Sequence, residues 1–389
     1  MRALLSPEST PRRVSDPVGR IHALDAARGG AMVLVVVGHA LLSFMRTPVG
    51  WAIQDRSQHL IFDAMVWIAH AFLMPVFFLI AGFLARATIA GAGIRAFIRQ
   101  RALRILVPLA VLALPNSFVM NHLWDLGLVR SGGHRISVAA TLPALRTGSS
   151  FSLGHLWFLY YLLLLSVAVL LLWALASRLS MDAQRRIEAR MRSLGVSPFL
   201  PIPMIGCVAA ILWWCGKLQV DTPLWFVPDP AILAYYAVFF AWGILLHAGN
   251  PALDSGARWG RGHLIGAALL LGLLAPFALR GDDPRRSAGL SLLLFPAGAA
   301  LTCLLVAGFM AACARHANRP RPSLRALSRA SFWTYVMHLP LVVFLQIQCA
   351  DLDGPAPLKL SLILAITLGA CLASHRYLVR RTILRLFFG

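Results

Sequence analysis

The sequence has little charge, and acidic residues are especially scarce. Asp, Glu, Lys and Arg make up 13% of its 389 residues, with 15 acidic and 36 basic side chains. Hydrophobic residues reach 59%, a share that excludes an ordinary soluble domain. The six cysteines include no C-x-x-C pair, and most lie in apolar runs, where cysteine acts as a small hydrophobe. We therefore expect neither a disulfide framework nor a metal site.

The basic excess gives a net charge of +21. Such an excess is typical of proteins that bind nucleic acid, an anionic membrane surface or an anionic substrate. The basic residues separate long apolar runs and form no stripe interleaved with aromatic residues. This arrangement marks the cytoplasmic loops of membrane proteins and not a nucleic-acid surface. The first expected partner is the lipid bilayer, and nucleic acid is not expected.

Long apolar segments recur along the chain. A membrane-spanning helix needs about 20 mostly apolar residues, and ten segments meet this description. They predict an all-α polytopic membrane protein, a bundle of about ten transmembrane helices. The segments are 24–45, 60–85, 102–120, 155–176, 199–216, 231–247, 263–279, 288–314, 331–349 and 358–374.

The distribution of basic residues predicts the orientation. Ten crossings place 25 of the 36 Lys and Arg on the side that holds both chain ends, so both termini are expected in the cytoplasm. A signal peptide is an alternative for the first run, but Asp25 and Arg28 interrupt it and no small-residue cleavage site follows. We expect a cytoplasmic N-terminal tail over 1–23, a transmembrane domain over 24–378 and a cytoplasmic C-terminal tail over 379–389.

Titratable groups at membrane depth are costly and therefore mark candidate functional sites. In the first predicted span Asp25 and Arg28 are three positions apart and share a helix face. Arg28 and His39 are eleven apart, which returns His39 to that face roughly 16 Å deeper. A neutral imidazole there could act as a general base on a hydroxyl. The alternative is a structural ion pair near the surface, with His39 hydrogen-bonding between helices.

Arg101 and Arg104 are three positions apart where the third span begins. Guanidinium groups at a helix N-terminus favour phosphate, because the helix dipole adds to their charge. The alternative is that they only mark the cytoplasmic side, which is the interpretation we prefer for the nearby Arg95 and Arg99.

Three further polar sets interrupt apolar helices. Ser331, Tyr335 and His338 recur at i, i+4 and i+7, and Asp63 and His70 are seven apart, so each set shares one helix face. Hydrogen bonding between helices is the alternative to a functional role for both sets. His155 and Trp157 begin the fourth span, where an aromatic belt at the membrane surface is the alternative.

The chain resembles the acyltransferase 3 family of multi-span membrane acyltransferases. The resemblance is carried by motifs in the family's order: LDAARGGAMVLVVVGHA at 24–40, HAFLMPVFFLIAGFL at 70–84, RALRILVP at 101–108, HLWFLYYLLLL at 155–165 and SFWTYVMHLPL at 331–341. Within that family the chain is most similar to glucan biosynthesis protein C. It departs from that pattern at Leu73, where the subgroup tends to have Arg, and at Ala81, where the family usually has Ser.

The resemblance implies a membrane-bound O-acyltransferase in the inner membrane of a bacterial cell. It would move an acetyl or succinyl group from cytoplasmic acyl-CoA, the co-substrate, to a hydroxyl of an envelope or periplasmic carbohydrate such as a glucan. His39 would act as general base or as acyl relay, with Arg28 and Asp25 orienting the donor. The remaining expected site residues are Arg101 and Arg104 for the CoA phosphates, and His338, Tyr335, His70, His155 and Trp157 for the acceptor.

Two other classes of function stay open at this point. The same buried imidazoles could serve a proton-coupled exporter or flippase that moves unmodified glycan. A membrane assembly partner without catalytic activity is the third possibility. The sequence leaves open the acyl group, the carbohydrate and the oligomeric state.

Overall fold

The computed structural model describes residues 21–131, 152–249, 260–280, 284–285 and 287–389, and every regular element in these residues is helical. The predicted N-terminal tail lies outside the described residues up to position 20. The α-helices are α1 (His22–Leu41), α2 (Leu60–Arg101), α3 (Val107–Arg130), α5 (Trp157–Ala176), α6 (Met181–Val196), α7 (Pro201–Cys215), α8 (Pro230–Gly249), α9 (Gly260–Arg280), α10 (Ala288–His316), α11 (Pro322–Cys349), α12 (Ala356–Tyr377) and α13 (Arg385–Phe388).

The all-α polytopic prediction is confirmed. In the described part of the chain eight helical segments are long and apolar enough to cross a membrane, or nine if the bent pair of α6 and α7 forms one span. The second and third predicted spans belong to one helical run, Leu60–Arg130. The fifth is α7, whose 15 residues reach only about 22 Å, less than the hydrocarbon thickness of about 30 Å.

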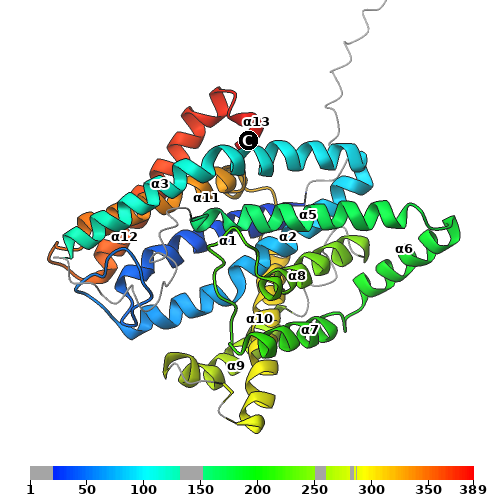
Figure 1. The fold of residues 1–389 in the computed structure, drawn as a ribbon, viewed down its shortest axis with the longest axis horizontal. Helices are drawn as coiled ribbons and strands as arrows, with labels where there is room; N and C mark the ends of the chain where they lie inside the picture. Colours follow the sequence, from blue (N-terminus) through cyan, green and yellow to red (C-terminus); the bar gives the residue numbers. More distant parts are fainter. Residues whose placement is uncertain (1–20, 132–151, 250–259, 281–283, 286) are drawn as a thin grey trace, which may run out of the picture.

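Gly93 divides the long helical run. Its backbone angles, φ 82° and ψ 171°, lie outside the helical region, and glycine adopts a positive φ without steric cost. An added Cβ would meet no atom within 4 Å, so the backbone conformation and not the available space requires glycine here. Figure 1 shows the chain turning back in this region, so that α3 returns across the bundle. Both predicted spans are therefore present as two arms of one run.

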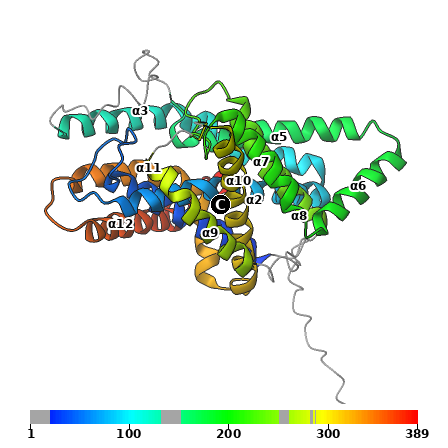
Figure 2. The same ribbon diagram turned by 90° about the horizontal axis from the view of Figure 1, so that it is seen from below.

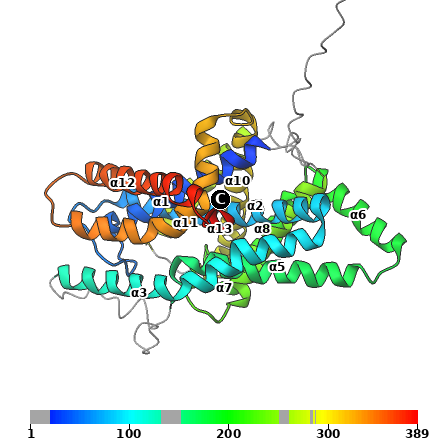
Figure 3. The ribbon, with the colours of Figure 1, turned by 90° about the horizontal axis from the view of Figure 1, so that it is seen from above.

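Helix α1 lies in the centre of the bundle and packs against α2, α10, α11 and α12. Figure 3 shows α11 and α12 lying alongside α1, with α3 beyond them. Helices α9 and α10 pack together and cross the direction of these long helices (Figures 1 and 2). The central position of α1 puts its polar face inside the protein, where the candidate site residues lie.

Helices α2 and α8 approach each other unusually closely at two glycines. A Cβ added at Gly82 would collide with the carbonyl oxygen of Phe240, and one added at Gly243 would collide with the carbonyl oxygen of Leu79. Only glycine allows such an approach of two helix backbones. This contact fixes α2, which supplies much of the candidate site.

Helix α6 is a charged, amphipathic element joined to the rest of the bundle at two places. The side chain of Arg86 on α2 forms an ion pair with Glu188 on α6. Gly195 and Gly249 bring the ends of α6 and α8 into backbone contact. Helix α7 then leaves α6 at an angle of 93°. The predicted cytoplasmic arginines of 185–192 thus lie on a short helix of their own.

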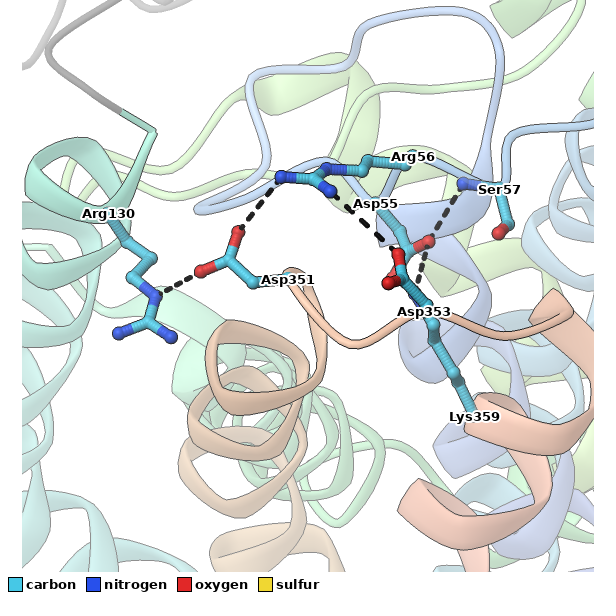
Figure 4. A network of polar contacts seen from close by, with 7 residues as sticks. All are labelled: Asp55, Arg56, Ser57, Arg130, Asp351, Asp353 and Lys359. Carbon is cyan, nitrogen blue, oxygen red and sulfur yellow. Dashed lines mark hydrogen bonds and ion pairs between the residues drawn. The ribbon is translucent and has the colours of Figure 1, made fainter.

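A network of ion pairs joins three segments on the predicted outer side (Figure 4). Nζ of Lys359 on α12 lies 2.9 Å from a carboxylate oxygen of Asp55, and both side chains are buried. Asp351 accepts a hydrogen bond of 2.6 Å from Arg130 and lies 3.9 Å from Arg56. The segment between α1 and α2 is therefore fixed to α3 and to the α11–α12 connection.

The predicted C-terminal tail is packed onto the bundle. Val379 is fully buried and Phe388 is buried against Trp333 and Phe332 of α11. Helix α13 also contacts the turn between α2 and α3. Residues 379–389 are thus continuous with the helical domain and do not form a separate tail, because their apolar side chains complete a small hydrophobic cluster.

Candidate active site

A cavity of about 1290 Å³ runs through the bundle. Its wall is formed mainly by α1, α2, α3, α5 and α11, by the segments that precede α2, α3 and α5, and by the α7–α8 connection. Residues of α8 and α9 complete it. Nine of the ten predicted site residues line it, and Asp25 does not. The nine are Arg28, His39, His70, Arg101, Arg104, His155, Trp157, Tyr335 and His338.

Asp25 and Arg28 are joined through a serine of another helix. Oγ of Ser328 on α11 donates a hydrogen bond of 2.7 Å to Asp25 and accepts one of 2.9 Å from Arg28. Arg28 also donates to the carbonyl oxygen of Ser328 at 2.8 Å. Gly29 allows the two helices to meet here, since an added Cβ would come within 3.1 Å of Leu327 and Ser328. The side chain of Arg28 is thus fixed at one end of the cavity.

Arg101 and Arg104 lie at the same cavity, but not at a helix N-terminus. The helical run resumes after Gly93, about two turns before Arg101, and continues through a π-helical turn, Ala102–Leu106, into α3. Free amide groups at a helix start are therefore remote from Arg101. The predicted contribution of a helix dipole is wrong, so the attraction of Arg101 and Arg104 for an anion would come from their guanidinium groups.

The side chain of Arg101 is held by both arms of the helical run that Gly93 divides. It donates a hydrogen bond of 3.3 Å to the carbonyl oxygen of Ala81, and its guanidinium lies 4.9 Å from the centre of the Phe97 ring. The π-helical turn then carries Arg104, which is exposed. Such turns are frequent at functional sites, because they change which side chains face the same way.

His39 lies in the cavity wall between these arginines and the outer loops. Its Nδ1 is 3.0 Å from the carbonyl oxygen of Val35 and 3.3 Å from Nε2 of His338. A carbonyl oxygen can only accept a hydrogen bond, so Nδ1 of His39 carries the proton. Nε2 of the neutral ring then carries the lone pair, and no hydrogen bond within the described residues occupies it. This is the tautomer that a general base requires.

His338 is completely buried behind His39. Its Nδ1 lies 2.8 Å from the carbonyl oxygen of Tyr335 and 3.0 Å from that of Thr334, so this nitrogen also carries a proton. Nε2 of His338 consequently accepts the hydrogen bond from Nδ1 of His39. Two backbone carbonyl groups of α11 thereby direct a second acceptor toward Nδ1 of His39, in agreement with the tautomer that the Val35 carbonyl group requires.

His155 and Trp157 are both buried and do not form an aromatic belt at the membrane surface. Nε2 of His155 donates a hydrogen bond of 3.2 Å to the carbonyl oxygen of Val336, and the hydroxyl group of Tyr335 donates to the carbonyl oxygen of His155. The His155 ring lies 5.6 Å from the ring of His338. The start of α5 is thus fixed against α11, and the belt alternative is wrong.

Asp63 and His70 share a helix face but have separate partners. Asp63 accepts hydrogen bonds of 2.9 Å from the backbone N–H groups of Arg46 and Thr47. Nε2 of His70 lies 2.9 Å from the carbonyl oxygen of Val220, between α7 and α8. Asp63 therefore holds the loop that follows α1, whereas His70 joins the α7–α8 connection to the cavity wall.

Comparison with known families identifies this arrangement. The model of the acyltransferase 3 family, described as an acyltransferase domain, matches residues 21–376, nearly the whole described chain. The chain belongs to the acyltransferase 3 family. No curated protein and no solved structure gives a significant match. The protein is therefore a multi-pass membrane acyltransferase, and the exporter and assembly-partner alternatives are not retained.

Two uncharged residues of this acyltransferase were missed at the sequence level. Ser328 joins Asp25 to Arg28, and Gln346 donates hydrogen bonds of 3.0 Å to the carbonyl oxygens of His39 and Ala40. Both are buried. Gln346 and Gln348 are the two amides of the otherwise apolar run LVVFLQIQC, so a search for amides in apolar segments as well as for charges would have found Gln346.

Metal binding by the described residues of the acyltransferase would require several donor side chains that converge on one point. In this part of the chain no group of three or more His, Cys, Asp or Glu side chains has the geometry to hold a metal ion. The three neighbouring imidazoles of His39, His338 and His155 hydrogen-bond to backbone carbonyl groups or to one another. His39 and His338 thus form a hydrogen-bonded pair, and His155 contacts His338 only through its ring.

Proposed function

We propose that the chain is an O-acyltransferase that moves an acetyl or succinyl group from cytoplasmic acyl-CoA to a hydroxyl group of an envelope carbohydrate. The observation that carries this proposal is that one cavity contains Arg101 and Arg104, His39 and the outer loops. Substrates from the two sides of a membrane could meet in it. His39 is the residue at which they would react.

The donor would enter from the end of the cavity that holds the arginines. Moving several phosphate charges into the interior is prohibitively costly, so the CoA phosphates would stay at Arg101 and Arg104, where guanidinium groups can grip them in pairs. Arg28, held by Ser328, lies on the α1 face that leads to His39. The acyl thioester would extend along this face.

The chemical step would use the lone pair on Nε2 of His39. The acceptor hydroxyl gives its proton to Nε2 as its oxygen attacks the thioester carbonyl carbon. The carbon–sulfur bond then breaks, and the leaving thiolate takes the proton from His39. The products are the carbohydrate ester and free CoA. The alternative is a relay, in which Nε2 first takes the acyl group and then passes it to the hydroxyl.

The acceptor contacts predicted at the sequence level divide into two kinds. The hydroxyl group of Tyr335 and both ring nitrogens of His338 are engaged by protein groups, which favours positioning roles for these two residues. His70 is exposed to the cavity and remains a candidate contact. His155 and Trp157 are buried wall residues that hold α5 in place.

The cellular setting follows from the same proposal. We propose that the protein lies in the inner membrane of a bacterial cell, where an envelope carbohydrate could reach the outer end of the cavity. The resemblance of the sequence motifs to glucan biosynthesis protein C is the reason for proposing a glucan as the acceptor. Mass spectrometry of envelope carbohydrates from cells with and without the protein would identify the acyl group and the glycan.

The proposal is tested by acyl transfer in membrane vesicles that contain the full chain. Radiolabelled acetyl-CoA or succinyl-CoA is supplied with envelope carbohydrate extracted from cells that lack the protein. Label in carbohydrate and release of free CoA are both measured. We expect His39→Ala to lower transfer by a factor of about 10²–10⁴, the usual contribution of a general base. The matched control is His122→Ala, which changes an exposed histidine of α3.

Each outcome of this experiment has a distinct meaning. Transfer by His39→Ala at the rate of the unaltered protein would overturn the role of His39. Absence of labelled carbohydrate with either donor would overturn the proposed substrates. Label bound covalently to the protein before acceptor is added would support the relay over direct transfer.

A further inference from the structure

Two tryptophans form the outer wall of the cavity next to His39. The centre of the Trp51 ring lies 6.1 Å from that of His39, with an angle of 34° between the ring planes. The Trp124 ring lies 5.2 Å from the Trp51 ring at an angle of 74°. Both tryptophans line the cavity and are partly exposed. An aromatic corner therefore stands directly beside the proposed base.

Hydrogen bonds fix both indole rings. Nε1 of Trp51 donates to Oε1 of Gln346 at 2.7 Å, and the amide nitrogen of Gln346 donates to the carbonyl oxygens of His39 and Ala40. Nε1 of Trp124 donates to the carbonyl oxygen of Gly50 at 3.3 Å. Because both N–H groups are already engaged, the rings can offer a ligand only their faces. Gln346 further makes Trp51 and the backbone of His39 one rigid unit.

Polar groups accompany these rings in a regular pattern. Ser117, Asn121 and Trp124 recur at i, i+4 and i+7 on α3, and all three line the cavity. They therefore form a stripe of one hydroxyl, one amide and one indole along a single helix face. Ser117 is the buried member of this stripe, and its Oγ accepts a hydrogen bond of 3.1 Å from the backbone N–H of Ser152. Gly127 allows this part of α3 to contact the loop after α1, since an added Cβ would collide with the carbonyl oxygen of Ala52. The stripe is thus held opposite Trp51.

We propose that this corner is the acceptor subsite, in which a sugar ring stacks on Trp51 and is flanked by Trp124, Asn121 and Ser117. The inference rests on the proposed function and names its acceptor-binding residues. A pyranose ring has an apolar C–H face that suits an electron-rich indole, and a rim of hydroxyl groups that needs donors and acceptors. The subsite would present one of these hydroxyl groups to Nε2 of His39. The amide and hydroxyl groups favour a sugar over the acyl chain of the donor as the occupant, because an acyl chain offers them no hydrogen-bonding partner.

The test uses the transfer assay with the full chain in membrane vesicles. Extracted envelope carbohydrate is titrated at saturating acyl-CoA, and acyl-CoA is titrated at saturating carbohydrate. We expect Trp51→Ala and Trp124→Ala each to raise the apparent KM for the carbohydrate about tenfold and to leave the KM for acyl-CoA unchanged. Trp51→Phe, which keeps a ring face, should recover most of the loss. The control is Trp214→Ala, an 81% exposed residue outside the cavity wall, which should change neither constant.

The results that overturn the inference differ from those that overturn the function. If the unaltered chain labels no carbohydrate, the proposed function fails. If the unaltered chain is active but both alanine variants keep its carbohydrate KM, the acceptor subsite is wrong. A rise in the KM for acyl-CoA instead would assign the corner to the donor. If the alanine variants only lower the amount of protein in the membrane, and the remaining enzyme keeps both KM values, the tryptophans have a packing role and the subsite is wrong. Trp51→Phe keeps a ring in place, so its KM values report on binding without this loss of protein.

Discussion

Nε2 of His338 lies 3.3 Å from Nδ1 of His39, although the two residues are 299 positions apart in the sequence. His338 is fully buried and is itself oriented by two carbonyl groups of α11. The pair resembles a base with its orienting partner, in which the second group fixes the tautomer of the first. A role for His338 in positioning His39 can be separated experimentally from a direct role in substrate binding.

We expect His338→Ala to lower kcat about tenfold or more and to leave the KM values for both substrates nearly unchanged. Without His338, Nδ1 of His39 keeps only Val35 as partner and the ring can turn. His338→Gln should retain more activity, because an amide oxygen can still accept from Nδ1. Steady-state kinetics in vesicles measure both constants. The control is His375→Ala, a buried histidine of α12 outside the cavity wall; a rise in carbohydrate KM with unchanged kcat would contradict the prediction.

Replacement of the cavity arginines should weaken donor binding. Charge-assisted hydrogen bonds contribute about 1.5–3 kcal/mol, so Arg101→Ala or Arg104→Ala should raise the KM for acyl-CoA by roughly ten- to a hundredfold. Lysine at either position should also be impaired, because it cannot form a paired phosphate contact. The effect should vanish with acyl-pantetheine, which lacks the phosphates. Arg95→Ala and Arg99→Ala, both exposed, serve as controls, and an equal effect in them would contradict a specific site.

The buried ion pair of Asp55 and Lys359 should be sensitive to one-sided replacement. Their side chains are only 3% and 5% exposed, so Lys359→Met leaves an unpaired carboxylate in the interior and should cost about 3–5 kcal/mol. The double variant with Asp55→Leu should recover much of this loss. Thermal unfolding in detergent measures both. Arg56→Ala, at an exposed pair, should leave Tm unchanged; additive losses in the double variant would show that the two groups do not interact.

Gly82→Ala should destabilise the contact between α2 and α8. The added methyl group would meet the carbonyl oxygen of Phe240, and overpacking of this kind costs about 1–3 kcal/mol. Gly369→Ala on α12 is the matched control, because a Cβ there meets no atom within 4 Å and alanine is the better helix former. Folded protein in the membrane and its Tm are the measurements. Equal stability of the two variants would show that α8 can move away from α2.

Much of the helical architecture is predictable from sequence, because each apolar segment carries its own signal. All ten predicted segments fall on helices. The joining of two segments into Leu60–Arg130 was not predictable, because it depends on the backbone conformation that Gly93 adopts in the folded chain. The prediction that a helix begins near Arg101 was wrong for the same reason, because the helical run resumes directly after Gly93.

The candidate site was partly predictable, because residues spaced by whole helix turns share a face. The rule predicted that Arg28 and His39 share a face of the first helix, and both line one cavity. It contains no information about partners on other helices. The contacts of Asp25 with Ser328 and of His39 with Gln346 span about 300 positions, and no local pattern encodes them. The catalytic and binding roles themselves stay predictions.

The packing of α13 links residues 385–388 to the end of the cavity that holds Arg101 and Arg104. Phe388 is buried against α11, and α13 contacts the turn that carries Arg104. Trimming the final turn, or fusing a purification tag directly to Gly389, would disturb a packed contact next to this arginine. Such a change is expected to lower the affinity for acyl-CoA, although residues 385–388 lie outside every motif that resembles the family.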